Sequence, residues 1–274
     1  MSQQGRAAAA PGEASGMAMP ALFIGHGHPM NAIQTNEFTQ SLARIGAGLP
    51  RPAAILVVSA HWLTYSAAAV SSTAQPATVY DFGNFAPDLF RVVYAAPGAP
   101  ALAALVRETV RAVKLRDDTR RGLDHGAWTI LKHIYPHADI PVFQLSIDFA
   151  KTAPYHYALG RELSFLRQRG VLVVGSGNIV HNLSRITWDD VDGRTEDWAK
   201  EFDALVKQYL LAGNHRALVD YEKLGAGADI SIPTCDHYLP MLYVLGLQGD
   251  KDPITFVHEG FQYANLSMRC FQVG

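Results

Sequence analysis

Four short runs of consecutive apolar residues are the clearest hydrophobic pattern in the chain. Each run has four to seven residues, is rich in Val, Ile, Leu or Phe, and is bounded by Gly, Pro or polar residues, as strands are. Because apolar residues do not alternate with polar ones, both faces of these strands are predicted to be covered. The predicted strands are residues 21–24, 53–59, 141–147 and 171–175.

Segments in which apolar residues recur at helical spacing lie between and after these runs. Strands that alternate with helices are typical of an α/β domain with a central, mostly parallel or mixed sheet flanked by helices. There is no internal repeat and no linker beyond residue 20, so residues 21–274 are predicted to form a single domain. The predicted helices are residues 36–47, 100–113, 126–134, 154–169, 196–211 and 236–245.

The first twenty residues differ from the rest of the chain. They are rich in Ala, Gly, Ser and Pro and follow no period. Their run of four alanines is too short for the apolar core of a signal peptide. We interpret residues 1–20 as a disordered leader, with Met17 or Met19 as alternative starts.

Composition narrows the class of protein. Apolar residues make up 49% of the chain and charged residues 18%, which favours a large core and excludes global disorder. The formal net charge is −2 without any block of Lys and Arg, so nothing favours nucleic acid or an anionic membrane as a partner. No run approaches the roughly 18 apolar residues that suggest a membrane-spanning helix. With two cysteines and no CxxC pair, we expect a reducing, cytoplasmic compartment.

Histidines stand where three of the four predicted strands end. His26, His61 and His181 follow these strands, and His237 opens the last predicted helix. Ligands of open α/β sheets bind beyond the carboxyl ends of the strands, and neutral imidazole is a good ligand for iron or zinc. Each of these histidines alone is more often structural, but the fold would gather them at one edge of the sheet. The sequence therefore predicts a metal site at the carboxyl ends of the strands.

Two interpretations of His125 stay open. It stands just before a predicted helix, and Asp124 beside it is a suitable N-cap, which makes the pair structural. Alternatively, His125 is an acid–base group or a hydrogen-bond donor to a substrate.

The remaining histidines are predicted to lie outside the site. His133 and His137 have the spacing of a helical metal pair, but a proline interrupts the helix between them, so we interpret both as surface residues. His156 and His215 lie in polar helical stretches and are predicted to be solvated. Glu259, next to a histidine near the C-terminus, is the carboxylate we expect nearest to the site.

Nine motifs, taken together, resemble one known family: the DODA-type extradiol ring-cleavage dioxygenases of the LigB-like, class III group. They occur in order from about residue 20 to the C-terminus, so that residues 21–274 correspond to the catalytic domain. The motifs are GHGHPMNAI, VVSAHW, YDFGNF, YAAPG, GLDHGAW, DIPVFQLSID, GSGNIVHNL, HYLPMLYVLG and LSM.

The resemblance implies a role for each of five histidines. His26, His61 and His237 correspond to the metal ligands of the family. His181 is either a fourth ligand or the catalytic base, and His125 contacts the substrate and assists proton transfer. The implied reaction uses Fe(II) to open the ring of a catechol with O2, while His181 or His125 removes a catechol proton and later returns one.

Further side chains are candidates for binding the substrate. His28, the second histidine of GHGH, stands where many relatives carry serine, and it either competes for the metal or contacts the substrate. An apolar wall for the ring is predicted from Trp62, Tyr80 and Phe82, together with Phe85. Arg91 and Arg269 are candidates for a substrate carboxylate.

Two other functions fit the same residues. A site made only of histidines also suits Zn(II), which would make the protein a zinc-dependent hydrolase or lyase. The third hypothesis is a non-catalytic metal-binding protein on the same scaffold. A homo-oligomer is compatible with all three.

Overall fold

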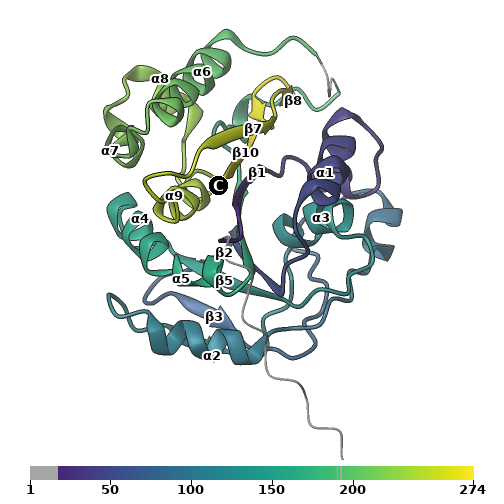
Figure 1. The fold of residues 1–274 in the computed structure, drawn as a ribbon. Helices are drawn as coiled ribbons and strands as arrows, with labels where there is room; N and C mark the ends of the chain where they lie inside the picture. Colours follow the sequence, from purple (N-terminus) through teal and green to yellow (C-terminus); the bar gives the residue numbers. More distant parts are fainter. Residues whose placement is uncertain (1–17, 190, 192) are drawn as a thin grey trace, which may run out of the picture.

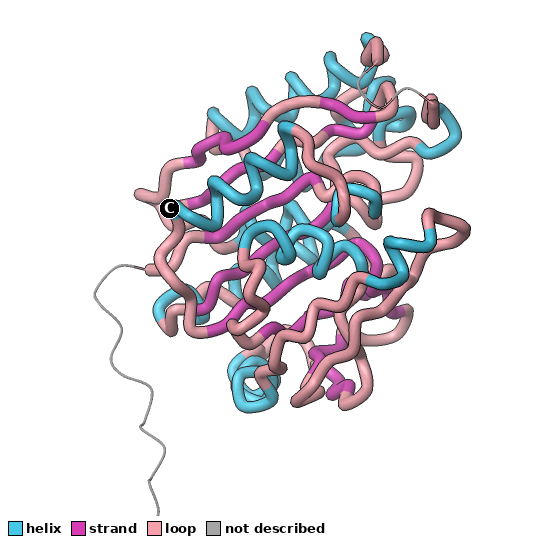
Figure 2. Tube along the Cα trace, turned by 90° about the vertical axis from the view of Figure 1, so that its right-hand side faces the viewer, coloured by secondary structure: helices cyan, strands magenta, loops and turns pink. Residues whose placement is uncertain are grey.

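The computed structural model of the protein describes residues 18–189, 191 and 193–274. The predicted leader falls almost entirely outside the described residues. The described chain forms one α/β unit whose strands cross its middle between layers of helices (Figures 1 and 2). The single-domain α/β prediction is confirmed.

An eight-stranded mixed sheet, in the order β4-β3-β5-β2-β6-β1-β10-β7, forms the centre of the described structure. Strands β5, β2, β6 and β1 run parallel, whereas at one edge β10 pairs antiparallel with β1 and β7 pairs antiparallel with β10. The four central strands are those predicted from the apolar runs. The strands are β1 Ala21–Gly25, β2 Ala54–Thr64, β3 Ala69–Ser71, β4 Arg116–Asp118, β5 Val142–Asp148, β6 Val171–Gly177, β7 Ile254–His258 and β10 Cys270–Val273, with a separate pair β8 Phe261–Gln262 and β9 Leu266–Ser267.

Two hydrophobic cores cover the two faces of the sheet. Successive residues of β1 point to opposite faces, so Phe23 joins one core and Leu22 and Ile24 join the other. This double burial explains the continuous apolar runs of the central strands. Helices α1 and α3 cover one face, and α2, α4, α5 and α9 cover the other (Figure 1).

The helices follow the prediction closely at their starts. Asn36 caps α1 and Asp124 caps α3, in each case by accepting a hydrogen bond from a backbone N–H of the first turn. The predicted helix 154–169 is two helices, because the chain turns after Glu162. The helices are α1 Glu37–Gly48, α2 Pro100–Thr109, α3 His125–Ile134, α4 Ala153–Glu162, α5 Phe165–Gln168, α6 Asp197–Leu211, α7 His215–Val219, α8 Ala226–Ser231 and α9 Leu239–Gly246.

Strand β2 is longer than predicted and contains an irregularity. Val58 pairs with Leu145 of β5, but the next pair is Leu63 with Ile147, so residues 59–62 bulge out of the ladder with β5. A bulge bends a strand and re-aims its side chains. Here it lies at the carboxyl end of the sheet and carries His61.

Among the helices of the described residues, none has the length and apolarity that a membrane crossing needs.

Candidate active site

Five histidine rings converge at the carboxyl ends of β1, β2 and β6. His26, His61, His125, His181 and His237 come from five separate segments, yet each ring lies within 5.7 Å of another, centroid to centroid. The structure thus brings together all five histidines to which the sequence assigned a role at the metal or in proton transfer.

His26 is held by a tight turn directly after β1. Gly27 adopts a φ of +63°, a conformation that favours glycine. A Cβ on Gly27 would lie 2.5 Å from Cε of Met268, so a side chain there would displace the end of the Met268 side chain. The GHG sequence therefore places the His26 ring where it faces His61 across the sheet edge.

Three imidazole groups have the geometry of a metal site. The ligand nitrogens of His26, His61 and His237 all lie within 4.8 Å of one another, and the Nε2 atoms of His26 and His61 are 3.0 Å apart. Metal–nitrogen bonds of about 2 Å allow one ion to bridge such a group. His181 is not part of this group; its ring stacks on that of His237 at 3.5 Å and 5°.

The Nδ1 atoms of His26 and His237 are held by polar partners. Nδ1 of His26 lies 2.9 Å from Oγ of Ser176, whose hydroxyl donates to the carbonyl of Gly126, so Nδ1–H donates to Ser176. Nδ1 of His237 lies 2.5 Å from Oδ2 of Asp236. These partners keep the protons on Nδ1 and leave the Nε2 lone pairs for a metal.

Asp81 is a site residue that the sequence analysis missed. Its Oδ1 accepts hydrogen bonds from both the backbone N–H and Nδ1 of His125, each at 3.0 Å, and its Oδ2 lies 3.9 Å from Nδ1 of His61. Burial alone would raise the pKa of Asp81, but the hydrogen bonds and charge of His125 lower it below its ordinary value. A carboxylate therefore orients His125 with Nε2 free. The sequence feature that could have identified Asp81 is the YDFGNF motif, because its only titratable groups are Tyr80 and Asp81.

Burial keeps three histidines of the cluster neutral. It lowers the pKa of His26 and of His61, and neighbouring histidines add to the effect. Burial, followed by His237, also lowers the pKa of His181. Neutral imidazole is the form that binds a metal or accepts a proton, so His26, His61 and His181 are in the state that either role needs.

Comparisons with known proteins agree with this geometry. Residues 20–271 match the family described as the catalytic LigB subunit of aromatic ring-opening dioxygenase. The chain is 44% identical to the 4,5-DOPA dioxygenase extradiol of Escherichia coli (strain K12), over 93% of this chain and 95% of that protein. It is 34% identical to the protein of the same name from Mirabilis jalapa, over 87% and 90%. A crystal structure of an uncharacterized protein from Escherichia coli K12 matches with a TM-score of 0.81 at 42% identity, over 93% of this chain and 100% of that one.

The chain belongs to the LigB family. The predicted family and the enzyme class, an extradiol dioxygenase that incorporates O2, are thereby confirmed. Membership implies non-haem Fe(II) as the metal and an aromatic diol and O2 as reactants. The three converging imidazoles fit such an ion. Neither rival, the zinc hydrolase or lyase and the non-catalytic metal-binding protein, gains support from these relatives.

Aromatic side chains of this LigB-family site line one side of the histidine cluster. The ring of Phe82 lies 5.5 Å from that of His125 and 5.4 Å from that of Phe85. Tyr80 packs beside Phe82, and its hydroxyl donates to the carbonyl of Val92. The long segment between β3 and α2 thus supplies both the wall and Asp81.

Trp62 has a different environment. It is buried, and the guanidinium carbon of Arg121 lies 5.1 Å from the centre of its ring. Among the described residues, no ring contact joins Trp62 to the five histidines. Its role in substrate binding stays a prediction.

Several residues expected in or near the site lie elsewhere. Glu259 binds Lys207 and Arg269 instead of approaching the histidines, because these cations flank the end of β7. Arg269 is buried with Asp203, which neutralises it, and Arg91 is an exposed partner of Asp88. Neither Arg91 nor Arg269, the two candidates for binding a substrate carboxylate, therefore lies at the histidine cluster.

The predictions for the outlying histidines are partly wrong. His156 is fully buried and bonds to the hydroxyl of Tyr243 at 2.9 Å, because α4 packs closely against α9. His215 is half-buried between Tyr157 and Gln248. His137 is exposed as predicted, but His133 is half-buried, because its Nε2 lies 2.8 Å from the carbonyl oxygen of Asn31. Helix α3 ends before His137, so the two histidines form no helical metal pair.

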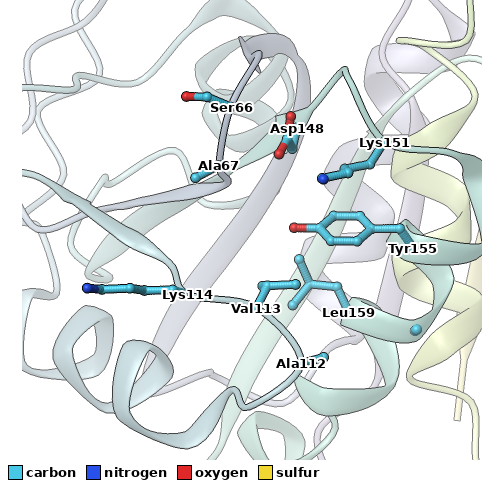
Figure 3. Close-up of a pocket in the computed structure, with 10 residues that line it drawn as sticks. Ser66, Ala67, Ala112, Val113, Lys114, Asp148, Lys151, Tyr155 and Leu159 are labelled. Carbon is cyan, nitrogen blue, oxygen red and sulfur yellow. The ribbon is translucent and has the colours of Figure 1, made fainter.

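A cavity of about 490 Å³ has a lining that Figure 3 shows in close-up. It opens between α2 and α4 at the end of β5, and its lining includes Val113, Asp148, Lys151, Tyr155 and Leu159. None of the five histidines lines it. The cavity is therefore not the catalytic centre.

Proposed function

We propose that this protein opens the ring of a catechol-type diol beside the two hydroxyl groups, with both atoms of O2 entering the product. The observation that carries the proposal is the convergence of three imidazoles whose ligand nitrogens lie within 4.8 Å of one another, next to two further histidines. The product is an aldehyde-bearing semialdehyde of the muconate type.

His26, His61 and His237 would hold Fe(II), with Ser176 and Asp236 fixing two of the rings. When bound, Fe(II) would supply a site for the diol and O2 and the redox chemistry that lets O2 react with the diol, which amino-acid side chains alone do not provide. Zn(II), the second metal expected from the sequence, has no support from the family.

His125 and His181 are the proposed acid–base groups. Nδ1–H of His125 donates to Asp81, so its Nε2 is free to accept a proton from a catechol hydroxyl. His181 lies outside the metal-sized group but stacks on His237, which favours proton transfer over the alternative role as a fourth ligand. Asp81 would stabilise the cationic form of His125 after it accepts the proton.

Binding of the aromatic ring is assigned to the wall that contains Tyr80 and Phe82, with His28 beyond it. Relatives carry the name 4,5-DOPA dioxygenase extradiol, and we extend only the catechol part of that substrate to this protein.

We further propose residues 21–274 as the catalytic domain. A cytoplasmic location and a homo-oligomer stay predictions; the cysteines Cys235 and Cys270 are both free thiols, as a reducing compartment would leave them.

The test is oxygen consumption with parallel ultraviolet–visible spectra. The protein is reconstituted with Fe(II) without oxygen and then given O2 and a panel of catechols that includes DOPA. We expect one O2 per diol and a new absorption band of the ring-opened product. The variant His26→Ala should lose both, whereas His137→Ala, at an exposed histidine, should keep them. If the iron-loaded protein takes up no oxygen with any diol, the proposal is wrong.

A further inference from the structure

His28 lies in an aromatic enclosure next to the histidine cluster. Its side chain is 9% exposed. The ring centroid lies 4.7 Å from that of Phe85, 5.0 Å from that of Tyr263 and 5.6 Å from that of Trp188. His28 is absent from the metal-sized group around His26, so the structure does not favour the interpretation that it competes for the metal.

The hydrogen bonds of His28 define which ring nitrogen carries the proton. His28 is the N-cap of the short 3-10 helix Pro29–Ala32, and its Nδ1 accepts a hydrogen bond from the backbone N–H of Met30 at 3.3 Å. A nitrogen that accepts a hydrogen bond carries no proton, so the proton of the neutral ring is on Nε2.

The Nε2–H donor is buried and has no hydrogen-bond partner in the described structure. Buried donors are almost always paired, and an unpaired one destabilises the protein. An exception beside an active site is a place where a ligand can supply the missing acceptor.

A row of aromatic contacts connects His28 to the proposed acid–base group. It runs from His125 to Phe82 at 5.5 Å, on to Phe85 at 5.4 Å, and from there to His28 at 4.7 Å. A diol that lies along this wall, with its hydroxyl groups at the cluster, extends its ring substituent toward His28. Tyr263 and Trp188 enclose the far end of the row.

We propose that Nε2–H of His28 donates a hydrogen bond to an acceptor on the ring substituent of the diol. The preferred substrates are then catechols whose side chain carries a carboxylate or carbonyl oxygen, rather than unsubstituted or alkyl catechols. This inference rests on the proposed function. His28 is a specificity residue in it and takes no part in the metal chemistry.

The experiment compares two diols of matched length, 3,4-dihydroxyphenylacetate and 4-ethylcatechol, which differ in the acceptor. We expect the native enzyme to favour the acid in kcat/KM by about 10-fold or more, the effect of one buried hydrogen bond. In His28→Phe, which keeps a ring but no donor, the preference should vanish through a higher KM for the acid. His28→Ser keeps a side-chain acceptor for the N-cap and should also lose the preference for the acid. This second variant tests the inference if His28→Phe fails to fold. His137→Phe is the matched control at an exposed histidine.

Two measurements do not depend on turnover. Calorimetry of both diols without oxygen should show the same preference in the dissociation constant and its loss in both variants. Nitrogen-15 spectra of the imidazoles should show protonated Nε2 in His28 and a shift of its signal when the acid binds.

Equal kcat/KM for the two diols in the native enzyme, or an unchanged preference in both variants, would overturn the inference while the dioxygenase stands. Failure of the native enzyme to open either diol, or any catechol of the panel, would overturn the proposed function as well.

Discussion

At the residue scale, the partner of one ring nitrogen determines what the other nitrogen can do. Ser176 and Asp236 bind Nδ1 of two histidines that would hold the metal, and Asp81 binds Nδ1 of His125. The three partners differ in charge. A carboxylate increases the basicity of the ring it binds, whereas a hydroxyl mainly orients it. Removal of each partner should therefore have its own effect.

Asp236→Asn should weaken the metal site. Loss of the charge beside His237 lowers the basicity of that ligand, and metal affinity should fall by about 10–100-fold. The measurement is a competition titration of the metal without oxygen. Asp229→Asn, at an exposed position of α8, should bind metal like the native protein. Equal affinity in both variants would show that Asp236 does not tune the ligand.

Asp81→Asn should impair proton transfer without unfolding the protein. The amide oxygen can still accept the two hydrogen bonds of His125, but it no longer stabilises a cationic ring. We expect kcat to fall by about 10-fold or more, yet by less than the ~10²–10⁴-fold typical of losing the acid–base group itself, as in His125→Phe. KM should change little. The pH profile of kcat should shift in Asp81→Asn but not in Asp88→Asn, an exposed carboxylate of the same segment.

The histidines of the site could be predicted from the sequence, but their carboxylate partners could not. His26, His61 and His181 follow apolar strands, and strand ends meet at one edge of a sheet, so order along the chain implied proximity. Asp81 lies in a segment without a period, 44 residues before His125, and only the folded loop brings the two together. Glu259 appeared near the site for the opposite reason, since adjacency to His258 in sequence did not bring it to the cluster.

At the element scale, burial explains which strands could be predicted. The central strands are covered on both faces and therefore read as apolar runs. Strand β4 is the sequence Arg-Asp-Asp at the edge of the sheet, with no apolar residue to reveal it. The bulge in β2 was also not predictable, because it is defined by pairing with β5 and not by the residues of β2 alone.

Helices α4 and α9 approach each other through glycine, which gives a test of the packing. A Cβ on Gly160 would lie 2.5 Å from the backbone oxygen of Tyr243, so the helices would have to move apart. Gly160→Ala should destabilise the protein by about 1–3 kcal/mol, the usual cost of overpacking. The measurement is urea unfolding followed by circular dichroism.

Gly48→Ala is the matched control for this change. Gly48 is the last residue of α1, and a Cβ there meets no atom within 4 Å. The same substitution should then be neutral or stabilise by up to about 1 kcal/mol through helix propensity. Equal effects of the two substitutions would show that close packing of α4 on α9 does not matter for stability.

At the scale of the whole molecule, folding buries histidines and so couples stability to pH. His156 is the clearest case away from the site. Burial lowers its pKa to about 4, although the carbonyl of Lys151 and the charge of Asp148 act in the other direction. Its Nε2 lies near the carbonyl of Lys151, and its Nδ1 accepts a hydrogen bond from the hydroxyl of Tyr243. A second proton on the ring would be on Nδ1 and would face that hydroxyl donor.

The sign of the effect follows from the two pKa values. Between the unfolded value of 6.5 and the native value of about 4, the unfolded chain binds a proton on His156 that the native protein does not. The free energy of unfolding therefore falls as pH falls through this window, by up to about 1.4 kcal/mol per pH unit for one proton. Above pH 6.5 the ring is neutral in both states, and below pH 4 it is charged in both.

His156→Gln should remove this contribution. Urea unfolding at several pH values from 4 to 7 should give a flatter dependence than in the native protein, with a difference of about 3 kcal/mol accumulated over the window. The variant loses a buried ring and is expected to be less stable at pH 7, so the slope and not the absolute stability is the readout. His137→Gln, at an exposed histidine, should keep the native slope. If His156→Gln keeps it too, His156 takes up its proton equally in the native and unfolded protein, and the acid sensitivity of the fold arises at other groups.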